Sequence, residues 1–211
     1  MTIQKVRLIM NRYIKASVLV MGLAASTFAW ADKAYFAGGC FWCMESDFEG
    51  LPGVLDVISG FTGSPLKNPT YNGNHEGHYE AIEVTYDPMV VSYQDLLDHY
   101  WLNIDPFDAA GQFCDRGHSY LAAIFVSAPE ERRLAKQSKQ EVVEQFPEQK
   151  VVTAILDASP FYPIAGDESY HQDYYMKSPV RYKLYRFSCG RDARLKAIWG
   201  AGNPLTSHSH N

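Results

Sequence analysis

The sequence predicts one α+β domain of ordinary globular size behind a short leader. Of its 211 residues, 46% are hydrophobic and 14% are aromatic, which suits a chain that buries a substantial core. Strand-like and helix-like segments follow one another without the strict alternation that produces a parallel, doubly wound sheet. The formal charge of −5, with no basic run after residue 16, argues against nucleic acid as a partner.

The first thirty-one residues have the form of a secretory signal peptide. The basic start contains Lys5, Arg7, Arg12 and Lys15. The uncharged segment 16–30 follows, and Ala29-Trp30-Ala31 has small residues at the two positions that a signal peptidase reads. This apolar segment is short for a bilayer of roughly 30 Å, although an uncleaved anchor is the alternative. We therefore expect an exported protein, periplasmic if the source is Gram-negative, with a signal peptide (1–31), one domain (32–199) and a flexible polar tail (200–211).

The first half of the domain alternates between predicted strands and helices. Segments 33–37, 54–61 and 80–86 are predicted strands, and segments 41–49 and 92–103 are predicted helices. Gly50 and Pro52 end the first helix, and Ser92 caps the second. The stretch 62–77 is rich in Gly, Pro and Asn, which predicts a long surface loop, and such loops are usually functional.

The second half is expected to be less regular. We expect an irregular stretch at 104–119, a strand at 120–127, a helix at 129–145, a strand at 151–156, a loop at 157–166 and a short helix at 167–176. Pro129 suits the first turn of its helix. In the polar tail, His208 and His210 are expected to be solvated and not to bind metal.

The most informative segment is Gly-Gly-Cys-Phe-Trp-Cys-Met-Glu-Ser at 38–46, where a predicted strand passes into a predicted helix. Cys40 should lie at the helix N-terminus, where free backbone N–H groups and the helix dipole favour an anion. A cysteine so placed is expected to have a lowered pKa and to be partly thiolate near neutral pH. The pattern therefore predicts that Cys40 is a nucleophile.

The expected mature chain contains four cysteines, Cys40, Cys43, Cys114 and Cys189. An even number in an exported protein suggests structural disulfides, although about 180 residues rich in apolar side chains need no such stapling. A zinc site at the Cys-x-x-Cys pair lacks a second pair or suitably spaced histidines. We expect neither metal nor cofactor. Cys114, beside Asp115, is expected to be a small buried apolar residue.

Further motifs follow the cysteine segment in order. They are Asn68-Pro69-Thr70-Tyr71, Gly77-His78-Tyr79-Glu80-Ala81, Val84-Thr85-Tyr86-Asp87-Pro88, Asp115-Arg116-Gly117 with Tyr120, and Phe161-Tyr162-Pro163 before His171-Gln172-Asp173-Tyr174-Tyr175. With Gly-Cys-Phe-Trp, these motifs make residues 33–191 resemble the A-type peptide methionine sulfoxide reductases. The resemblance implies a two-layer α/β sandwich on a ferredoxin-like βαββαβ core, covered by long loops. It also implies reduction of methionine sulfoxide, free or in oxidised proteins, with preference for the S epimer.

Sulfoxide reduction requires a nucleophilic thiolate, a protonated carboxylic acid, hydroxyl donors around the oxygen and an aromatic wall for the methyl group. The resemblance assigns these roles to Cys40 (nucleophile), Glu80 (proton donor), Tyr71 and Tyr120 (sulfoxide binding), Asp115 (pocket acid), and Phe41 and Trp42 (methyl pocket). Apolar neighbours would keep Glu80 protonated by raising its pKa. Spacing alone favours a solvated strand residue for Glu80 and an ordinary packing residue for each tyrosine, and the resemblance reverses this preference for Glu80.

Attack would leave Cys40 as a sulfenic acid, which condenses with a second thiol. Two candidates remain open for that thiol. Cys43 lies three residues on along the same helix face, and Cys189 lies in the polar segment 188–190, which could swing over the site. A thioredoxin-like protein dithiol would then reduce the disulfide, a requirement in tension with an oxidising periplasm. We expect a monomer.

Two other functions compete with this interpretation. The first is a thioredoxin-like dithiol-disulfide oxidoreductase that uses Cys40 and Cys43, for which no cis-proline context is apparent. The second is a non-catalytic exported protein whose cysteines are all structural. A single fast-reacting thiol would favour catalysis, whereas fully paired cysteines would favour a structural role.

Overall fold

The computed structural model describes residues 31–200. The predicted signal peptide, apart from Ala31, and the predicted tail with His208 and His210, apart from Gly200, fall outside the described residues. Among residues 31–200, no helix combines the length and the apolar character needed to cross a membrane.

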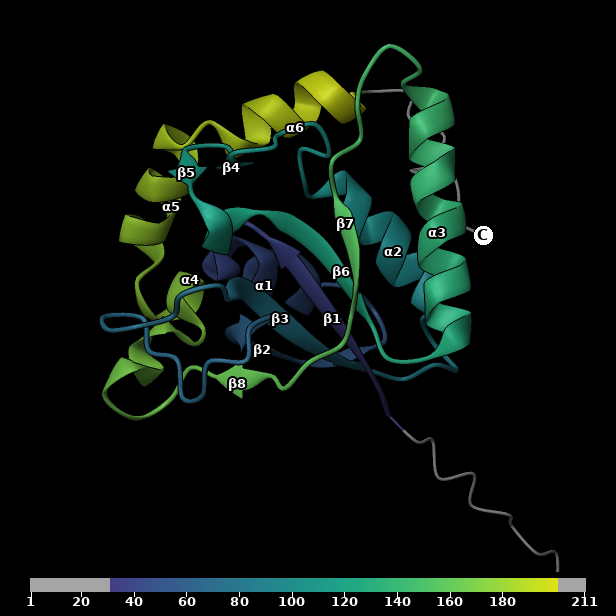
Figure 1. Ribbon diagram of the computed structural model, residues 1–211. Helices are drawn as coiled ribbons and strands as arrows, with labels where there is room; N and C mark the ends of the chain where they lie inside the picture. The colour runs from purple at the N-terminus through teal and green to yellow at the C-terminus, as the bar shows by residue number, and fades with distance from the viewer. Residues whose placement is uncertain (1–30, 201–211) are drawn as a thin grey trace, which may run out of the picture.

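The core of the domain is a βαββαβ unit (Figure 1). Its elements are β1 (Asp32–Gly38), α1 (Phe41–Glu49), β2 (Val54–Thr62), β3 (Tyr79–Tyr86), α2 (Tyr93–Leu102) and β6 (Ala122–Val126). The four strands lie in the order β6-β1-β3-β2, and each pair of neighbours is antiparallel. This order and direction define a ferredoxin-like sheet, so the predicted fold class is confirmed.

Two further strands extend the sheet at its edges. At one edge, β7 (Ala154–Asp157) pairs in parallel with β6 after the crossover helix α3 (Pro129–Gln145). At the other, β8 (Tyr162–Pro163) pairs with β2. The predicted strand at 120–127 begins two residues late, because His118–Tyr120 forms a 3₁₀ turn. Just before that turn, β4 (Gly111–Gln112) and β5 (Asp115–Arg116) form a small hairpin.

The two faces of the sheet are covered differently. On one face, the helices bury a large aromatic core in which Phe36 stacks on Phe48 and Tyr100, with centroid distances of 5.4 and 5.1 Å. On the other face, a smaller cluster includes Tyr79 and Phe125. A capping box starts α2, because the Ser92 side chain accepts from the backbone N–H of Asp95 while the Asp95 carboxylate accepts from that of Ser92.

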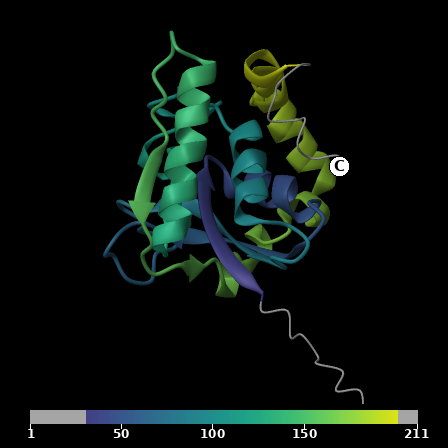
Figure 2. The ribbon, with the colours of Figure 1, turned by 90° about the vertical axis from the view of Figure 1, so that its right-hand side faces the viewer.

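The C-terminal part is helical where no helix was predicted. The expected helix at 167–176 is instead a 3₁₀ segment (Gly166–His171) followed by the short α4 (Tyr174–Lys177). Two unpredicted helices then follow, α5 (Pro179–Ser188) and α6 (Arg191–Trp199). Figures 1 and 2 both place α5 on the side of the molecule away from α3.

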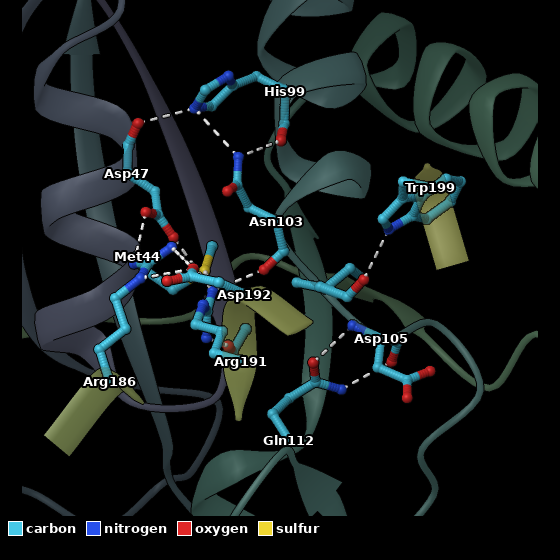
Figure 3. Close-up of polar contacts among 12 residues, drawn as sticks. Met44, Asp47, His99, Asn103, Asp105, Gln112, Arg186, Arg191, Asp192 and Trp199 are labelled. Carbon is cyan, nitrogen blue, oxygen red and sulfur yellow. Dashed lines mark hydrogen bonds and ion pairs between the residues drawn. The ribbon is translucent and has the colours of Figure 1, made fainter. Parts of the chain in front are cut away.

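A buried arginine docks the C-terminal helices (Figure 3). Arg191, only 1% exposed, donates to the carbonyls of Gly38 (3.2 Å) and Asn103 (2.6 Å). Asp47 of α1 pairs with both Arg191 (3.3 Å) and Arg186 (2.7 Å). This network fixes α5 and α6 against the end of β1 and against α1, where the candidate site lies.

Candidate active site

The turn between β1 and α1 requires glycine at two successive positions. Gly39 has φ +84°, and a Cβ there would lie 2.6 Å from Cβ of Gln112. A Cβ on Gly38 would lie 2.4 Å from Sδ of Met44. The two glycines let the chain turn tightly enough for Cys40 to be the N-cap of α1, as the sequence predicts.

Cys40 and Cys43 form a buried pair of free thiols, 6% and 2% exposed. Burial raises the pKa of Cys40 well above its ordinary value, and the neighbouring Cys43 and Glu80 raise it further. The pKa of Cys43 is lowered to about 7, first by its hydrogen bond with the Cys40 thiol and then by the charge of Arg191. The predicted low pKa of Cys40 is therefore wrong for this state, because burial outweighs the helix dipole.

Glu80 lies at the start of β3 and is 2% exposed. Its Oε2 accepts a hydrogen bond from the backbone N–H of Phe41 at 3.1 Å, and its carboxyl group is also hydrogen-bonded to Tyr120. Burial nevertheless raises the pKa of Glu80 to about 8, with the nearby Asp115 adding to the rise. The side chain is thus a carboxylic acid at neutral pH.

Tyr71 approaches this acid from the long 62–77 loop, and Tyr120 approaches it from the 3₁₀ turn before β6. The Tyr71 backbone N–H donates to Oε2 of Glu168 at 2.7 Å, which holds the long 62–77 loop against the C-terminal part of the chain. Burial raises the pKa of both tyrosines, and Glu80 adds to the rise in each case. Both hydroxyl groups therefore remain protonated and can donate hydrogen bonds.

The aromatic residues of the motif lie at different depths. Phe41 is fully buried and packs on Phe61 and Tyr71, so it supports the site from below. Trp42 is half-buried, stacks on Tyr174 with a centroid distance of 3.9 Å and donates from Nε1 to Nδ1 of His171 at 3.0 Å. Trp42 is the member of the predicted methyl pocket that presents an apolar ring at the surface of the site.

Asp115 connects this site to a disulfide. Cys114 and Cys189 are bonded to each other across 75 residues of sequence. The prediction that Cys114 is a buried apolar residue is wrong, because Cys114 is exposed on the β4–β5 hairpin and paired. The Oδ2 atom of Asp115 lies 3.9 Å from Sγ of Cys189 and accepts a hydrogen bond from the Tyr185 hydroxyl at 2.5 Å. Burial raises the pKa of Asp115.

Tyr185 and Arg191 are site residues that sequence reasoning missed. The Tyr185 hydroxyl is hydrogen-bonded to the Cys40 thiol as well as to Asp115. Arg191, on α6, is the positive charge that lowers the pKa of Cys43 most. A predicted helix over 179–188 would have revealed Tyr185, since a residue four before Cys189 lies on the same helix face.

Two groups among the described residues bring three potential metal ligands within 4.8 Å of one another. In the first, Cys114, Asp115 and Cys189, the sulfurs are consumed by the disulfide and cannot act as thiolate ligands. The second group consists of Glu45, Glu49 and Asp173. Here Glu45 accepts a hydrogen bond from the backbone N–H of Asp173, and Glu49 accepts one from the Tyr175 hydroxyl. Neither group includes Cys40 or Cys43, the two free thiols of the site.

The arrangement suits transfer of an oxygen atom to sulfur. A buried thiol, a second thiol beside it, a neutral carboxylic acid and phenolic donors surround one point at the start of α1. The free state of Cys40 and Cys43 does not fit the hypothesis of a protein whose cysteines are all structural.

The comparisons with known proteins agree with this geometry. Residues 32–203 match the family model described as peptide methionine sulfoxide reductase. The chain is 48% identical over 190 residues to peptide methionine sulfoxide reductase MsrA 2 of Caulobacter vibrioides, covering 88% of this chain and 95% of that protein. It is 48% identical over 173 residues to MsrA of Bacillus licheniformis, covering 80% of this chain and 94% of that protein.

Solved structures agree on the fold. Methionine sulfoxide reductase A of Corynebacterium diphtheriae superposes with a TM-score of 0.62 at 31% identity, covering 71% of this chain and 76% of that one. Reduced Mxr1 of Saccharomyces cerevisiae has the same TM-score at 22% identity, covering 71% of this chain and 86% of that one, and supports the fold alone. By its sequence, its fold and the geometry of its thiol site, the chain belongs to the peptide methionine sulfoxide reductase family.

Proposed function

We propose that this protein reduces methionine sulfoxide, free and in oxidised proteins, with Cys40 as the nucleophile. The observation that carries the proposal is the position of Glu80, a buried carboxylic acid hydrogen-bonded to the residue that follows Cys40. Such an acid can protonate the sulfoxide oxygen while the adjacent sulfur attacks. The relatives in Caulobacter vibrioides and Bacillus licheniformis bear names for this activity.

In the first step, the sulfur of Cys40 attacks the sulfoxide sulfur. Cys43 is the base beside it, with a pKa of about 7, and accepts the Cys40 proton. Glu80 donates its proton to the oxygen. The protonated oxygen is then transferred to Cys40 as the sulfur–oxygen bond of the substrate and the new sulfur–sulfur bond break. Cys40 thereby becomes a sulfenic acid, and methionine is released.

Hydroxyl donors and an aromatic ring bind the substrate. Tyr71 and Tyr120 donate hydrogen bonds to the sulfoxide oxygen as it gathers negative charge. Trp42, which stacks on Tyr174, packs against the methyl group of the substrate. Phe41 stacks on Tyr71 and so supports the site from the buried side. Asp115 orients the hydroxyl of Tyr185 toward Cys40. The S epimer is the substrate that the resemblance implies.

Cys43 is the resolving cysteine in this proposal. It is hydrogen-bonded to Cys40, whereas the other candidate, Cys189, is already held in a disulfide with Cys114. Condensation of the Cys40 sulfenic acid with the Cys43 thiol forms a disulfide and releases water. One sulfoxide is thus reduced to methionine, and two thiols are oxidised to one disulfide.

An outside protein dithiol of the thioredoxin type returns the enzyme to its reduced state. The basic start, apolar segment and Ala29-Trp30-Ala31 support export by a signal peptide and a periplasmic location. In that compartment the dithiol must itself be kept reduced. Because all proposed site residues come from one chain, a monomer suffices for activity.

The decisive experiment is dithiothreitol-driven turnover of the separated epimers of methionine sulfoxide by the wild type and by Cys40→Ser. We expect turnover of the S epimer by the wild type alone. Equal rates on both epimers would contradict the substrate assignment, and activity in Cys40→Ser would contradict the nucleophile. Cys43→Ser separates the oxidoreductase alternative, because it abolishes dithiol exchange but leaves a single round of sulfoxide reduction intact.

A further inference from the structure

The outer side of α5 carries large apolar side chains that stand exposed. Val180, Leu184 and Phe187 are 70%, 64% and 84% exposed. They recur at intervals of four and three residues and therefore form one stripe along the helix. The inner side of α5 is already occupied, because Tyr182 is buried against the thiol pair. A surface helix ordinarily turns its apolar stripe to the core, so an outward stripe marks a surface for something outside the fold.

Two cations border the stripe. Successive helix residues lie about 100° apart, so Arg181 and Lys183 project on either side of it. Both side chains are exposed, and no ion pair within the described part of the chain involves either of them. The outer side of α5 is thus apolar along its centre and positively charged along both margins.

The charge of this region is opposite to that of the whole chain. Residues 174–191 contain five Lys or Arg residues and no Asp or Glu, whereas the chain has a formal charge of −5. Part of the positive charge is used within the fold, since Arg186 pairs with Asp47 and Asp192. The cations at the margins of the stripe remain, so one apolar and positive surface lies on a body with an excess of acidic residues.

We propose that the outer side of α5 docks on the surface of a membrane that contains anionic lipids. The exposed aliphatic and phenyl side chains enter the boundary between headgroups and acyl chains, while the flanking cations meet the lipid phosphates. The same surface repels the acidic remainder of the chain, which fixes the side that turns to the membrane. The inference uses only the outer side of α5, so it does not depend on the proposed function.

The size of the patch favours a lipid surface over a protein. A stable protein interface buries about 800 Å² on each partner and draws on roughly 20 to 30 residues a side. Here three apolar and two cationic side chains stand out from one ten-residue helix at the margin of the molecule (Figure 1). A fluid bilayer yields around such a small convex patch and needs no matching surface. Packing of α5 on its copy in a second chain would instead bring like charges together.

The experiment reads the environment of α5 directly in the full chain. In Phe187→Trp, a new indole lies on the stripe, and its emission is obtained by subtracting that of the wild type with its four tryptophans. The vesicles contain phosphatidylglycerol and phosphatidylethanolamine with brominated acyl chains, which quench an indole that they contact. We expect them to quench the added emission by at least half. Gln140→Trp is the control and should not be quenched, because Gln140 is exposed on α3, on the side away from α5.

Charge variants test the class of lipid. In the Phe187→Trp background, Arg181→Gln/Lys183→Gln should raise the vesicle concentration for half-maximal quenching at least tenfold. Lys136→Gln/Lys150→Gln removes the same charge from exposed positions elsewhere and should change that concentration less than twofold. Brominated phosphatidylcholine vesicles should require at least tenfold more lipid than the anionic vesicles. Equal responses to the two lipids, or to the two charge variants, would contradict recognition of anionic headgroups.

Two outcomes would overturn the docking proposal as a whole. One is the absence of quenching in both Phe187→Trp and Leu184→Trp when their thermal midpoints equal that of the wild type. A folded α5 would then stay out of the membrane. The other is a blue shift of the added emission that grows with protein concentration without vesicles, which would assign this face to a second copy of the chain. Neither outcome bears on the proposed function, because the measurement involves no sulfoxide.

Discussion

The backbone N–H of Phe41 donates a 3.1 Å hydrogen bond to Oε2 of Glu80. This contact ties the acid on β3 to the first residue of α1, directly after Cys40. The first free N–H of the helix is thus directed to the carboxyl oxygen of Glu80. The pKa of the Cys40 thiol is raised chiefly by burial.

Glu80→Gln should slow the chemical step by about 10²- to 10⁴-fold, because the amide keeps an acceptor for Phe41 but has no acidic proton to donate. Single-turnover formation of methionine measures this step. Glu83→Gln is the matched control, since Glu83 lies on the same strand and binds Lys33 and Tyr35 away from the site. A normal rate in Glu80→Gln would remove Glu80 as the proton donor.

The pH dependence of that step should follow the same acid. Burial raises the pKa of Glu80 to about 8, so the protonated form predominates at neutral pH and is lost as pH rises through 8. The single-turnover rate of the wild type should therefore fall above about pH 8, and the profile of Glu80→Gln should not show this fall. A wild-type rate that keeps rising from pH 7 to pH 9 would contradict the assignment.

Stability should depend on pH through the same group. The folded-state pKa of Glu80 lies above its ordinary value, so its neutral form stabilises the fold fully below about pH 4.5 and less as pH rises through about 8. Urea unfolding between pH 6 and pH 9 should show a smaller loss of stability in Glu80→Gln than in the wild type. Parallel curves would indicate that Glu80 is charged in the folded protein.

Arg191→Met should be strongly destabilising. The change leaves the carbonyls of Gly38 and Asn103 without their buried donor and leaves Asp47 with Arg186 as its one remaining cation. Breaking such a buried pair costs roughly 3–5 kcal/mol. Lys196→Met is the control on the same helix. Lys196 is exposed, so a change within about 0.5 kcal/mol is expected. Urea unfolding compares the two, and similar losses would disprove the anchoring role of Arg191.

Gly39→Ala should cost more stability than Gly166→Ala. Both glycines have positive φ, +84° and +61°, and a left-handed alanine costs roughly 1–2 kcal/mol. Only at Gly39 does the new Cβ also meet another residue, Gln112, at 2.6 Å, whereas none lies within 4 Å at Gly166. Thermal unfolding should therefore rank Gly39→Ala as the less stable variant, and the reverse order would contradict the close packing of the turn.

Tyr185→Phe tests the residue that sequence reasoning missed. Loss of the hydroxyl removes the donor that stabilises the Cys40 thiolate, so the pKa of Cys40 should rise further. In a Cys43→Ser background, Cys40 is the one remaining free thiol among the described residues. Iodoacetamide at pH 8 should alkylate Cys40 more slowly in Cys43→Ser/Tyr185→Phe than in Cys43→Ser alone. Tyr170→Phe, on an exposed ring, should leave that rate unchanged.

Local sequence determined much of this protein. The alternating strands, the capped helix α2 and the Gly-Gly-Cys turn are short-range features, so the α+β class and the placement of Cys40 at a helix N-terminus could be predicted from them. In both cases the cause lies within a few residues of the effect. The βαββαβ core was implied by the family resemblance. The burial of Glu80 did not follow from spacing and was expected from the family resemblance.

Only the tertiary structure decided how the cysteines divide. The Cys114–Cys189 bond joins residues 75 positions apart, and the tyrosine beside Cys40 arrives on a helix whose docking depends on the buried Arg191. The pKa of Cys40 likewise depends on burial by several segments, which overrides the local effect of the helix. Desolvation and long-range pairing are properties of the packed chain, and sequence spacing carries no direct record of them.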